Sequence, residues 1–244
     1  MRGHRLNGDF DLAKVGALIG DEARAAMLLA LGTGRSRSAS DLALCASVTP
    51  QTASSHLAKL VAGGLLTVRR DGRGRWYRIS TPAVSAALEA LGRIAPVRAT
   101  NALSESDKSA ALRRARTCYD HLAGQLGVEL FASLVDRGAL RAVDTRSVAK
   151  RRSGLGPVTL GPKAEHMFAG LGIDLALVRE SPRQFATACL DWTEDAPHLA
   201  GALGAALCDA LFARGWFRHR RNDRALVVTE TGALGLRERF AVEL

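Results

Sequence analysis

Two segments in the C-terminal half of the chain bring cysteine, histidine and aspartate close together. The first is Cys118-Tyr119-Asp120-His121, and the second is Cys189-Leu190-Asp191-Trp192, followed by His198. Cys118 and His121 are predicted to lie at i, i+3 on one helix face, a spacing that offers two ligands to a zinc-like ion. A cysteine, aspartate or histidine of the second segment would complete a tetrahedral set. The candidate metal ligands are Cys118, His121, Cys189 and His198.

Two other interpretations of these segments stay open. A small organic effector could bind near Tyr119, Trp192 and the two histidines, because ligand pockets combine aromatic side chains with a few polar groups. The cysteines could instead be core residues, and the histidines structural, in a domain that binds no ligand. We favour the small-molecule effector, with a metal- or thiol-responsive site as the alternative. No Cys-x-x-Cys doublet is present, so no metal or other cofactor is assigned.

The same residues do not indicate an enzyme. A cysteine and a histidine on one helix do not form the usual nucleophile and base pair, which comes together from different elements. The sequence also has no glycine-rich phosphate loop, no His-Glu-x-x-His and no Gly-x-Ser-x-Gly motif. We therefore predict a binding protein without catalytic residues.

An internal repeat organises the region around these residues. His121-Leu122-Ala123-Gly124 recurs as His198-Leu199-Ala200-Gly201, and eleven of the twenty-one positions from 121 to 141 match at a fixed offset of 77. Each copy is interpreted as helix, helix, β-hairpin and helix, the order of a winged helix. The copies have apolar helices where a DNA reader would be polar, so we expect a sensor or dimerisation domain. Basic clusters at 150–152 and 218–221 could add phosphate contacts.

The N-terminal half contains a second set of residues with a recognisable purpose. Thr49 and Pro50 start a predicted helix, and its apolar positions lie on one face. These positions are Ala53, Leu57, Leu60 and Val61. The opposite face is polar but nearly uncharged, which suits close approach to base edges in a DNA groove. The residues of this helix predicted to contact DNA are Thr49, Gln51, Thr52, Ser54, Ser55, His56 and Lys59, with Gln51, Thr52 and Ser55 reading bases.

A basic β-hairpin is predicted directly after this helix. Gly63-Gly64 ends the helix, and two strands at 65–70 and 75–80 flank Asp71-Gly72-Arg73-Gly74, a typical hairpin turn. Arginines crowd the tip, where they would contact phosphates or enter a minor groove. They are Arg69, Arg70, Arg73 and Arg75. A short helix from Ser38, this helix and the hairpin together predict a winged helix-turn-helix.

These motifs resemble the arsenic-repressor (ArsR/SmtB) family of bacterial transcriptional regulators over about the first 95 residues. The resemblance is carried by Asp41-Leu42-Ala43, Ser55-His56-Leu57, Gly64-Leu65-Leu66 and the strand from Arg73 to Ile79. It implies a homodimer that binds an inverted repeat in double-stranded DNA. Ser38 and Ser40 occupy the positions of the family's Cys-x-Cys pair, and the helix after the wing lacks the family's other metal ligands. The family's known metal sites are therefore not expected here.

Composition and charge agree with a DNA-binding regulator. The formal net charge is +10, and residues 1–80 contain 12 Lys and Arg against 6 Asp and Glu, so the positive excess is concentrated on the predicted DNA-binding module. No signal peptide or long apolar run is visible, and four widely spaced cysteines favour a reducing cytoplasm. A sequence-neutral architectural DNA-binding protein is disfavoured by the uncharged polar helix face.

The predicted fold class is mainly α with small β-hairpins. Residues 1–95 form the winged helix-turn-helix domain, 96–106 form a linker, and 107–244 form the C-terminal domain. That domain contains two winged-helix-like repeats at about 107–174 and 183–244. The predicted function is an effector-responsive, homodimeric, sequence-specific repressor.

Overall fold

The structure is a computed structural model that describes residues 11–32, 34–72, 74–95, 103–141, 155–220 and 224–243. Contacts divide the chain into two compact units. The N-terminal unit comprises Met1–Leu31 and Ser36–Ser80, and the C-terminal unit comprises Gly32–Arg35 and Thr81–Leu244. The helix after the wing thus groups with the C-terminal unit, whereas the sequence assigned residues 1–95 to one domain. The predicted division into 1–95, 96–106 and 107–244 stays a prediction, and residues 96–102 lie outside the described residues.

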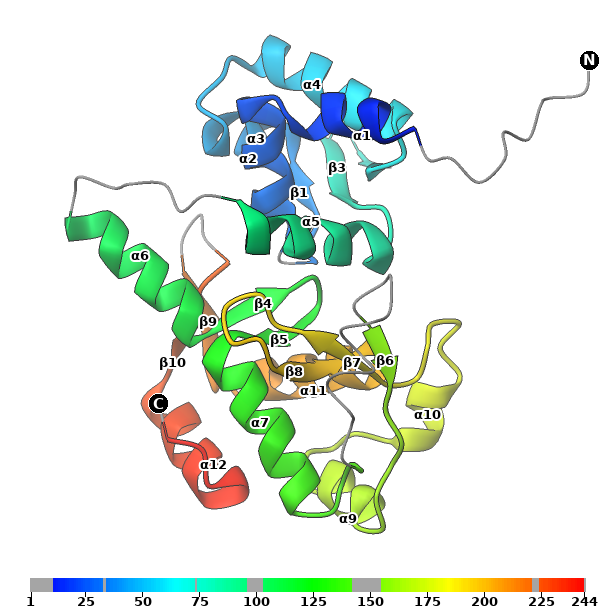
Figure 1. The fold of residues 1–244 in the computed structure, drawn as a ribbon, viewed down its shortest axis with the longest axis vertical. Coiled ribbons are helices and arrows are strands. Elements are labelled where there is room, and N and C mark those ends of the chain that lie inside the picture. The colour runs from blue at the N-terminus through cyan, green and yellow to red at the C-terminus, as the bar shows by residue number, and fades with distance from the viewer. Residues whose placement is uncertain are drawn as a thin grey trace, which may run out of the picture. The chain divides into compact units, whose positions relative to one another are not determined.

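The N-terminal unit is a small helical domain with a three-stranded antiparallel sheet of order β1-β3-β2 (Figure 1). Its helices are α1 (Leu12–Ile19), α2 (Glu22–Leu31), α3 (Ala39–Cys45) and α4 (Pro50–Ala62), and its strands are β1 (Arg37–Ser38), β2 (Leu66–Asp71) and β3 (Gly74–Ile79). The predicted helix-turn-helix and wing are confirmed.

Local signals explain these boundaries. The side chains of Ser38 and Thr49 accept hydrogen bonds from backbone N–H groups in the first turns of α3 and α4, which satisfies donors that helix starts leave unpaired. Gly64, which follows α4, has a φ of 75°, a conformation that favours glycine. On the predicted apolar face of α4, Ala53, Leu57 and Leu60 are buried, whereas Val61 is half-buried.

The C-terminal unit contains short hairpins packed with helices. Its helices are α5 (Pro82–Ile94), α6 (Leu103–Arg114), α7 (Gly124–Asp136), α9 (Ala164–Ala169), α10 (Leu175–Arg179), α11 (Gly201–Ala213) and α12 (Glu230–Phe240). Its strands are β4 (Arg116–Cys118), β5 (His121–Ala123), β6 (Leu155–Pro157), β7 (Thr187–Leu190), β8 (Pro197–Ala200), β9 (Phe217–His219) and β10 (Leu226–Val228). Hairpins β4-β5 and β9-β10 form two two-stranded sheets, which an isolated bridge between Arg116 and Ala225 joins, and β6-β7-β8 form one three-stranded sheet.

The two repeated sequences adopt the same local structure. Helices α7 and α11 occupy repeat-equivalent positions, and each is 13 residues long. Gly124 and Gly201 begin the two helices with φ values of 75° and 81°. A Cβ atom at Gly127 would lie 2.6 Å from the backbone oxygen of Leu122, and a Cβ at its repeat equivalent Gly204 would lie 2.5 Å from that of Leu199. Each helix thus approaches the preceding strand so closely that only glycine fits.

One part of the sequence interpretation was wrong. Cys118 and His121 do not share a helix face, because they lie on the neighbouring strands β4 and β5. Tyr119 starts the tight turn between them with a φ of 60°, which a helix cannot accommodate. A hairpin therefore precedes the long helix in each copy, and helix, hairpin and helix follow in the second copy as α11, β9-β10 and α12. The winged-helix-like character of the repeats stays a prediction.

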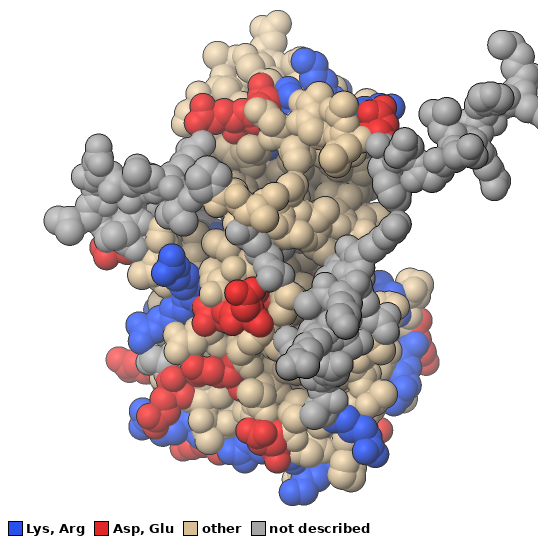
Figure 2. All heavy atoms as spheres, viewed as in Figure 1, with Lys and Arg blue, Asp and Glu red and all other residues tan. Residues whose placement is uncertain are grey.

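Charge and apolarity can be compared with the sequence expectations. On the face drawn in Figure 2, acidic and basic side chains of the described residues are intermingled over the C-terminal unit. Residues 150–152 and 221, part of the predicted auxiliary basic clusters, lie outside the described residues. Across the described part of the chain, no helix combines the length and apolarity that crossing a membrane requires.

Candidate functional site

The outer face of α4 is open to solvent in the N-terminal unit. Of the residues predicted to read bases, Gln51, Thr52 and Ser55 are all exposed. The hydroxyl of Thr52 lies 2.9 Å from that of Thr49, so this side chain is oriented along the first turn of the helix. Ser54 and Lys59 are also exposed. These five polar side chains of the DNA-binding prediction are therefore free of cover from their own domain.

His56 has a different environment from its neighbours on α4. Its side chain is only 15% exposed, and its Nδ1 atom lies 3.2 Å from Arg24 Nη1 and 3.7 Å from Asp21 Oδ1. No local sequence pattern indicates this contact with Arg24 of α2 and with Asp21. The predicted role of His56 at phosphate stays a prediction, and the structure gives the side chain a second role in joining α4 to α2.

The wing places arginines opposite one another. Arg70 and Arg75 are register partners on β2 and β3, and both are exposed. Like charges directly across a hairpin repel each other. An anion such as a phosphate would reduce the repulsion between these two arginines. Arg69 is also exposed and forms a 3.2 Å ion pair with Asp71. Arg73 lies outside the described residues.

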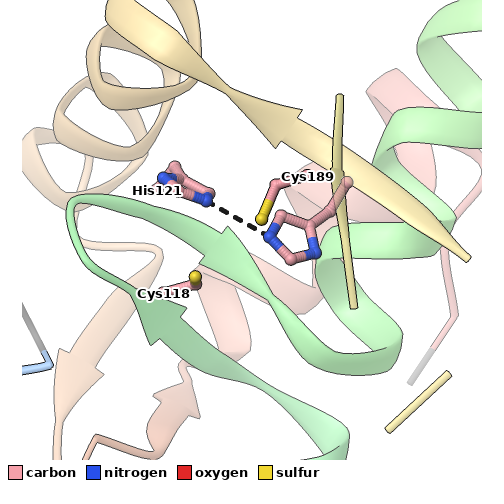
Figure 3. A group of neighbouring side chains, drawn as sticks. Cys118, His121 and Cys189 are labelled. Carbon is pink, nitrogen blue, oxygen red and sulfur yellow. Dashed lines mark hydrogen bonds between the residues drawn. The ribbon is translucent and has the colours of Figure 1, made fainter. Parts of the chain in front are cut away.

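The two hairpins of the C-terminal unit bring the four candidate metal ligands together. Cys118 is the register partner of His121 across β4 and β5, and Cys189 is the register partner of His198 across β7 and β8. One ligand atom from each of the four residues lies within 4.8 Å of all the others. Figure 3 shows the two cysteines and His121 converging from different strands. We call these four residues the Cys/His cluster.

Carboxylates hold the two imidazoles of the Cys/His cluster. His198 Nδ1 lies 3.1 Å from Asp191 Oδ2, and His121 Nδ1 lies 3.5 Å from Asp120 Oδ1. The Nε2 atoms of the two rings are left facing each other at 3.2 Å, the contact marked by the dashed line in Figure 3. Each aspartate is paired in turn with an arginine, Asp191 with Arg116 and Asp120 with Arg183. Two Arg-Asp-His series of contacts therefore meet at the pair of histidine Nε2 atoms.

The electrostatics of the cluster follow from this pairing. Burial lowers the pKa of His198, but the Asp191 carboxylate 3.1 Å away and the neighbouring Cys118 outweigh it and raise the pKa to about 9. Burial also opposes the charge on His121, whereas the Cys118 thiol and Asp120 raise its pKa. The pKa of Asp191 is lowered despite burial, because His198 and Arg116 stabilise the carboxylate. The pairing therefore favours the ionised form of Asp191 and the protonated forms of both histidines, although all three side chains are buried.

A cavity of about 240 Å³ adjoins the Cys/His cluster within the C-terminal unit. Its lining is predominantly apolar and includes Cys118, Tyr119, His121 and Cys189. The start of α5 also lines the cavity, through Pro82, Ser85 and Ala86. Such an apolar space next to polar groups has the character of a small-ligand pocket.

Only some of the predicted effector residues line this cavity. Trp192 lies against Arg116, with the guanidinium carbon 4.9 Å from the ring centroid, instead of lining the cavity. Asp191 is fully buried and faces Arg116 and His198. Sequence reasoning missed the supporting residues Arg116 and Arg183, because nothing in the local sequence marks a partner so distant in the chain.

The fold and the exposed helix face define the N-terminal unit as a winged helix-turn-helix domain, a class of domain that binds DNA. A family model described as a helix-turn-helix domain matches residues 19–69. The chain is 37% identical over 234 residues to the uncharacterized HTH-type transcriptional regulator YdfF of Bacillus subtilis (strain 168), and the match covers 96% of this chain and 99% of the relative.

The chain therefore belongs to the family of HTH-type transcriptional regulators, and it is a DNA-binding transcriptional regulator. The matched family is one of regulators and not of enzymes.

Among solved structures, the chain is similar to NolR from Sinorhizobium fredii, with 28% identity over 34% of this chain and 82% of that chain and a TM-score of 0.32. It is also similar to the homodimeric winged helix-turn-helix DNA-binding domain of a possible ArsR-family transcriptional regulator from Mycobacterium bovis. That match has 26% identity, covers 40% of this chain and 96% of the other, and has a TM-score of 0.33.

Proposed function

We propose that this regulator is a sequence-specific, effector-responsive repressor that acts as a homodimer in the cytoplasm. The observation that carries the DNA-reading part is the combination of an exposed, nearly uncharged face on α4 with an exposed arginine pair, Arg70 and Arg75, on the wing. Neutral hydrogen-bonding side chains suit base edges, and paired arginines suit phosphate or a narrow minor groove.

In this proposal α4 enters the major groove. Gln51, Thr52 and Ser55 contact base edges, because they are exposed and near the start of the helix. Thr49, Ser54, His56 and Lys59 position the helix against the backbone. The wing arginines Arg69, Arg70, Arg73 and Arg75 contact phosphates or the minor groove.

Exposed apolar side chains support the homodimer. In the N-terminal unit, Leu12 and Val15 on α1 are 77% and 42% exposed, and α1 has no buried residue. In the C-terminal unit, Ile94 near the end of α5 is 80% exposed. Exposed apolar side chains of this kind are typical of surfaces that a partner covers, and a twofold dimer would match an inverted repeat in the operator.

The Cys/His cluster supports a metal- or thiol-responsive regulator over the small-molecule sensor that the sequence favoured. Four side chains that are common metal ligands converge in one buried place, and the cluster borders a cavity that reaches α5. The wing strand β3 ends at Ile79, and α5 begins at Pro82, so only two residues connect them. A ligand that shifts the start of α5 would therefore also displace the end of β3. A small apolar effector in the 240 Å³ cavity is the second candidate, favoured by its apolar lining and Tyr119.

Competition binding tests the DNA-reading part. Operator DNA would be selected from random duplexes with the full chain, and its affinity compared with that of unrelated duplex at several salt concentrations. We expect a preference of about a thousandfold or more for the operator. The variant Gln51→Ala should change which sequence is preferred, and Arg75→Ala should weaken binding to all duplexes and reduce the salt slope by about one.

Arg237→Ala is the matched control, because Arg237 is an exposed arginine on α12, outside the proposed DNA-binding face. This variant should keep the affinity, the preference and the salt slope. Equal affinity for operator and unrelated duplex would contradict sequence-specific regulation, and an unchanged salt slope for Arg75→Ala would remove the wing from the interface.

A further inference from the structure

The Cys/His cluster has the composition and spacing of a single coordination site. We propose that Cys118, His121, Cys189 and His198 bind one zinc-class ion tetrahedrally, each histidine through its Nε2 atom. This inference rests on the proposed function and deepens it, because it names the class of ligand that the C-terminal unit takes.

The distances carry the first step. Two nitrogen ligands at about 2.0–2.1 Å from one ion, in tetrahedral geometry, are about 3.4 Å apart. The Nε2 atoms of His121 and His198 are 3.2 Å apart, close to that edge of a tetrahedron. All four ligand atoms lie within 4.8 Å of one another, so small rotations of the cysteine side chains would complete the set.

The orientation of the imidazoles carries the second step. Metal-binding histidines commonly present one nitrogen to the ion while the other contacts a carboxylate, which fixes the ring and its tautomer. Both histidines have this arrangement, with Nδ1 near Asp191 in one case and near Asp120 in the other. Asp191 and Asp120 are themselves held by Arg116 and Arg183.

Burial and charge carry the third step. The four residues are at most 6% exposed. Two thiolates would neutralise a doubly charged ion, so the ion would replace thiol protons in a buried place without adding net charge. In that exchange the two S–H protons and any proton on the imidazole Nε2 atoms leave to solvent, two sulfur–metal and two nitrogen–metal bonds form, and no electron is transferred. Soft sulfur and borderline imidazole ligands select zinc or a similar ion over magnesium or calcium.

The source of the ligands suggests what the ion does. The hairpin β4-β5 supplies one cysteine and one histidine, and the hairpin β7-β8 supplies the other pair. One ion would therefore join the two repeats of the C-terminal unit. With four protein ligands the coordination sphere is closed, as in structural and sensory sites, and unlike catalytic zinc sites, which keep an open position.

Metal binding by the full chain tests the proposal. The protein would be purified, stripped with a chelator under reducing conditions, and titrated with Zn²⁺ against a competing chelator, and separately with Co²⁺ under an absorption spectrometer. We expect one ion per chain, with cobalt giving the d–d bands of a tetrahedral site and a thiolate-to-metal charge-transfer band. Cobalt bound without the charge-transfer band, or no stoichiometric binding to the unaltered chain, would overturn the proposal without recourse to any variant.

Matched variants locate the ion. Cys118→Ala and Cys189→Ala should each remove the tetrahedral cobalt spectrum, whereas Cys208→Ala should keep it, because Cys208 is a buried cysteine in the apolar core, outside the cluster. Asp120→Asn should weaken Zn²⁺ binding by about 10–100-fold through His121. The exposed Asp136→Asn should not change it. Equal spectra for Cys118→Ala and Cys208→Ala would place the ion elsewhere and overturn the assignment.

The outcomes separate this inference from the proposed function. Specific DNA binding by a chain that takes up no metal would contradict the metal site and leave the DNA-binding proposal intact. Tetrahedral metal binding by a chain that does not distinguish operator from unrelated duplex would do the reverse. A disulfide between Cys118 and Cys189 in protein prepared under reducing conditions, found by mass spectrometry in place of a metal, would also overturn the metal site.

Discussion

Asp191 is the residue whose replacement tests the packing of the C-terminal unit most directly. Its carboxylate accepts hydrogen bonds from Arg116 Nη2 at 2.7 Å, from the backbone N–H of Gly124 at 2.7 Å and from the backbone N–H and hydroxyl of Thr193 at 2.9 and 2.8 Å. His198 Nδ1 lies 3.1 Å away. The substitution Asp191→Asn keeps the shape of the side chain, removes its charge and puts an NH2 group where a carboxylate oxygen accepts hydrogen bonds.

The expected loss of stability is large because the ion pair between Asp191 and Arg116 is completely buried. The side chains of Asp191 and Arg116 are both 0% exposed, so the substitution would remove this ion pair and leave the Arg116 charge in the protein interior. Removing one partner of such a buried pair costs about 3–5 kcal/mol. Since whole domains are stable by about 5–15 kcal/mol, the C-terminal unit would be close to unfolding.

The pH dependence follows from the pKa of Asp191. That pKa is lower in the folded protein than the usual value of 3.8, because His198 and Arg116 stabilise the ionised form against its burial. The carboxylate therefore contributes stability that is fully present above its unfolded pKa and is lost as the pH falls below 4 towards the folded pKa. The unaltered protein should lose stability in this range, and the Asp191→Asn variant should lose less over it.

Chemical unfolding of the chelator-treated protein, followed by circular dichroism, would measure both effects. Glu194→Gln is the control, because Glu194 is an exposed acid in the same loop, and surface substitutions of this kind change stability by about 0.5 kcal/mol or less. If Asp191→Asn cost less than about 1 kcal/mol at neutral pH, the buried ion pair would not stabilise the fold as argued here.

Three further substitutions test the fold. Gly204→Ala should destabilise the protein by about 1–3 kcal/mol, since its Cβ would lie 2.5 Å from the backbone oxygen of Leu199; thermal unfolding would show it, and an unchanged Tm would contradict the close approach. Leu57→Ala should cost about 2–5 kcal/mol in denaturant unfolding, because Leu57 is fully buried. Thr49→Ala removes the cap of α4 and should cost about 1 kcal/mol and weaken DNA binding in a filter or anisotropy assay; equal stability and affinity would show that the cap is dispensable.

The winged helix-turn-helix could be predicted from the sequence because its signals are local. Thr49 and Pro50 fixed the start of α4, and the glycines at 63 and 64 fixed its end. The wing followed from two short strands around Asp71-Gly72-Arg73-Gly74, and the observed register pairs Asp71 with Gly74. Cap, turn and apolar spacing each depend on neighbours within a few residues, so one sequence suffices to interpret them.

The supporting residues of the C-terminal unit could not be predicted in this way. Arg116 pairs with Asp191, and Arg183 pairs with Asp120, and each pair is far apart in the sequence. An arginine that neutralises a buried carboxylate has the same local sequence as one on the surface. The position of Cys118 and His121 on strands was also missed, since a short segment of mixed residues has no periodicity that separates a hairpin from a helix.

The repeat explains why the candidate ligands could be named although their geometry could not. The histidines and glycines recur at one offset, and a Cβ at Gly204 would lie 3.2 Å from the Cβ of His121, just as a Cβ at Gly127 would lie 3.4 Å from that of His198. The cysteines do not recur, because the turn between β7 and β8 is longer than the turn between β4 and β5. Each cysteine nevertheless lies directly across its hairpin from a histidine. The register between paired strands, and not the spacing along the chain, places these ligands together. Register depends on the length of the turn, and the spacing of the residues alone does not show where the turn begins and ends.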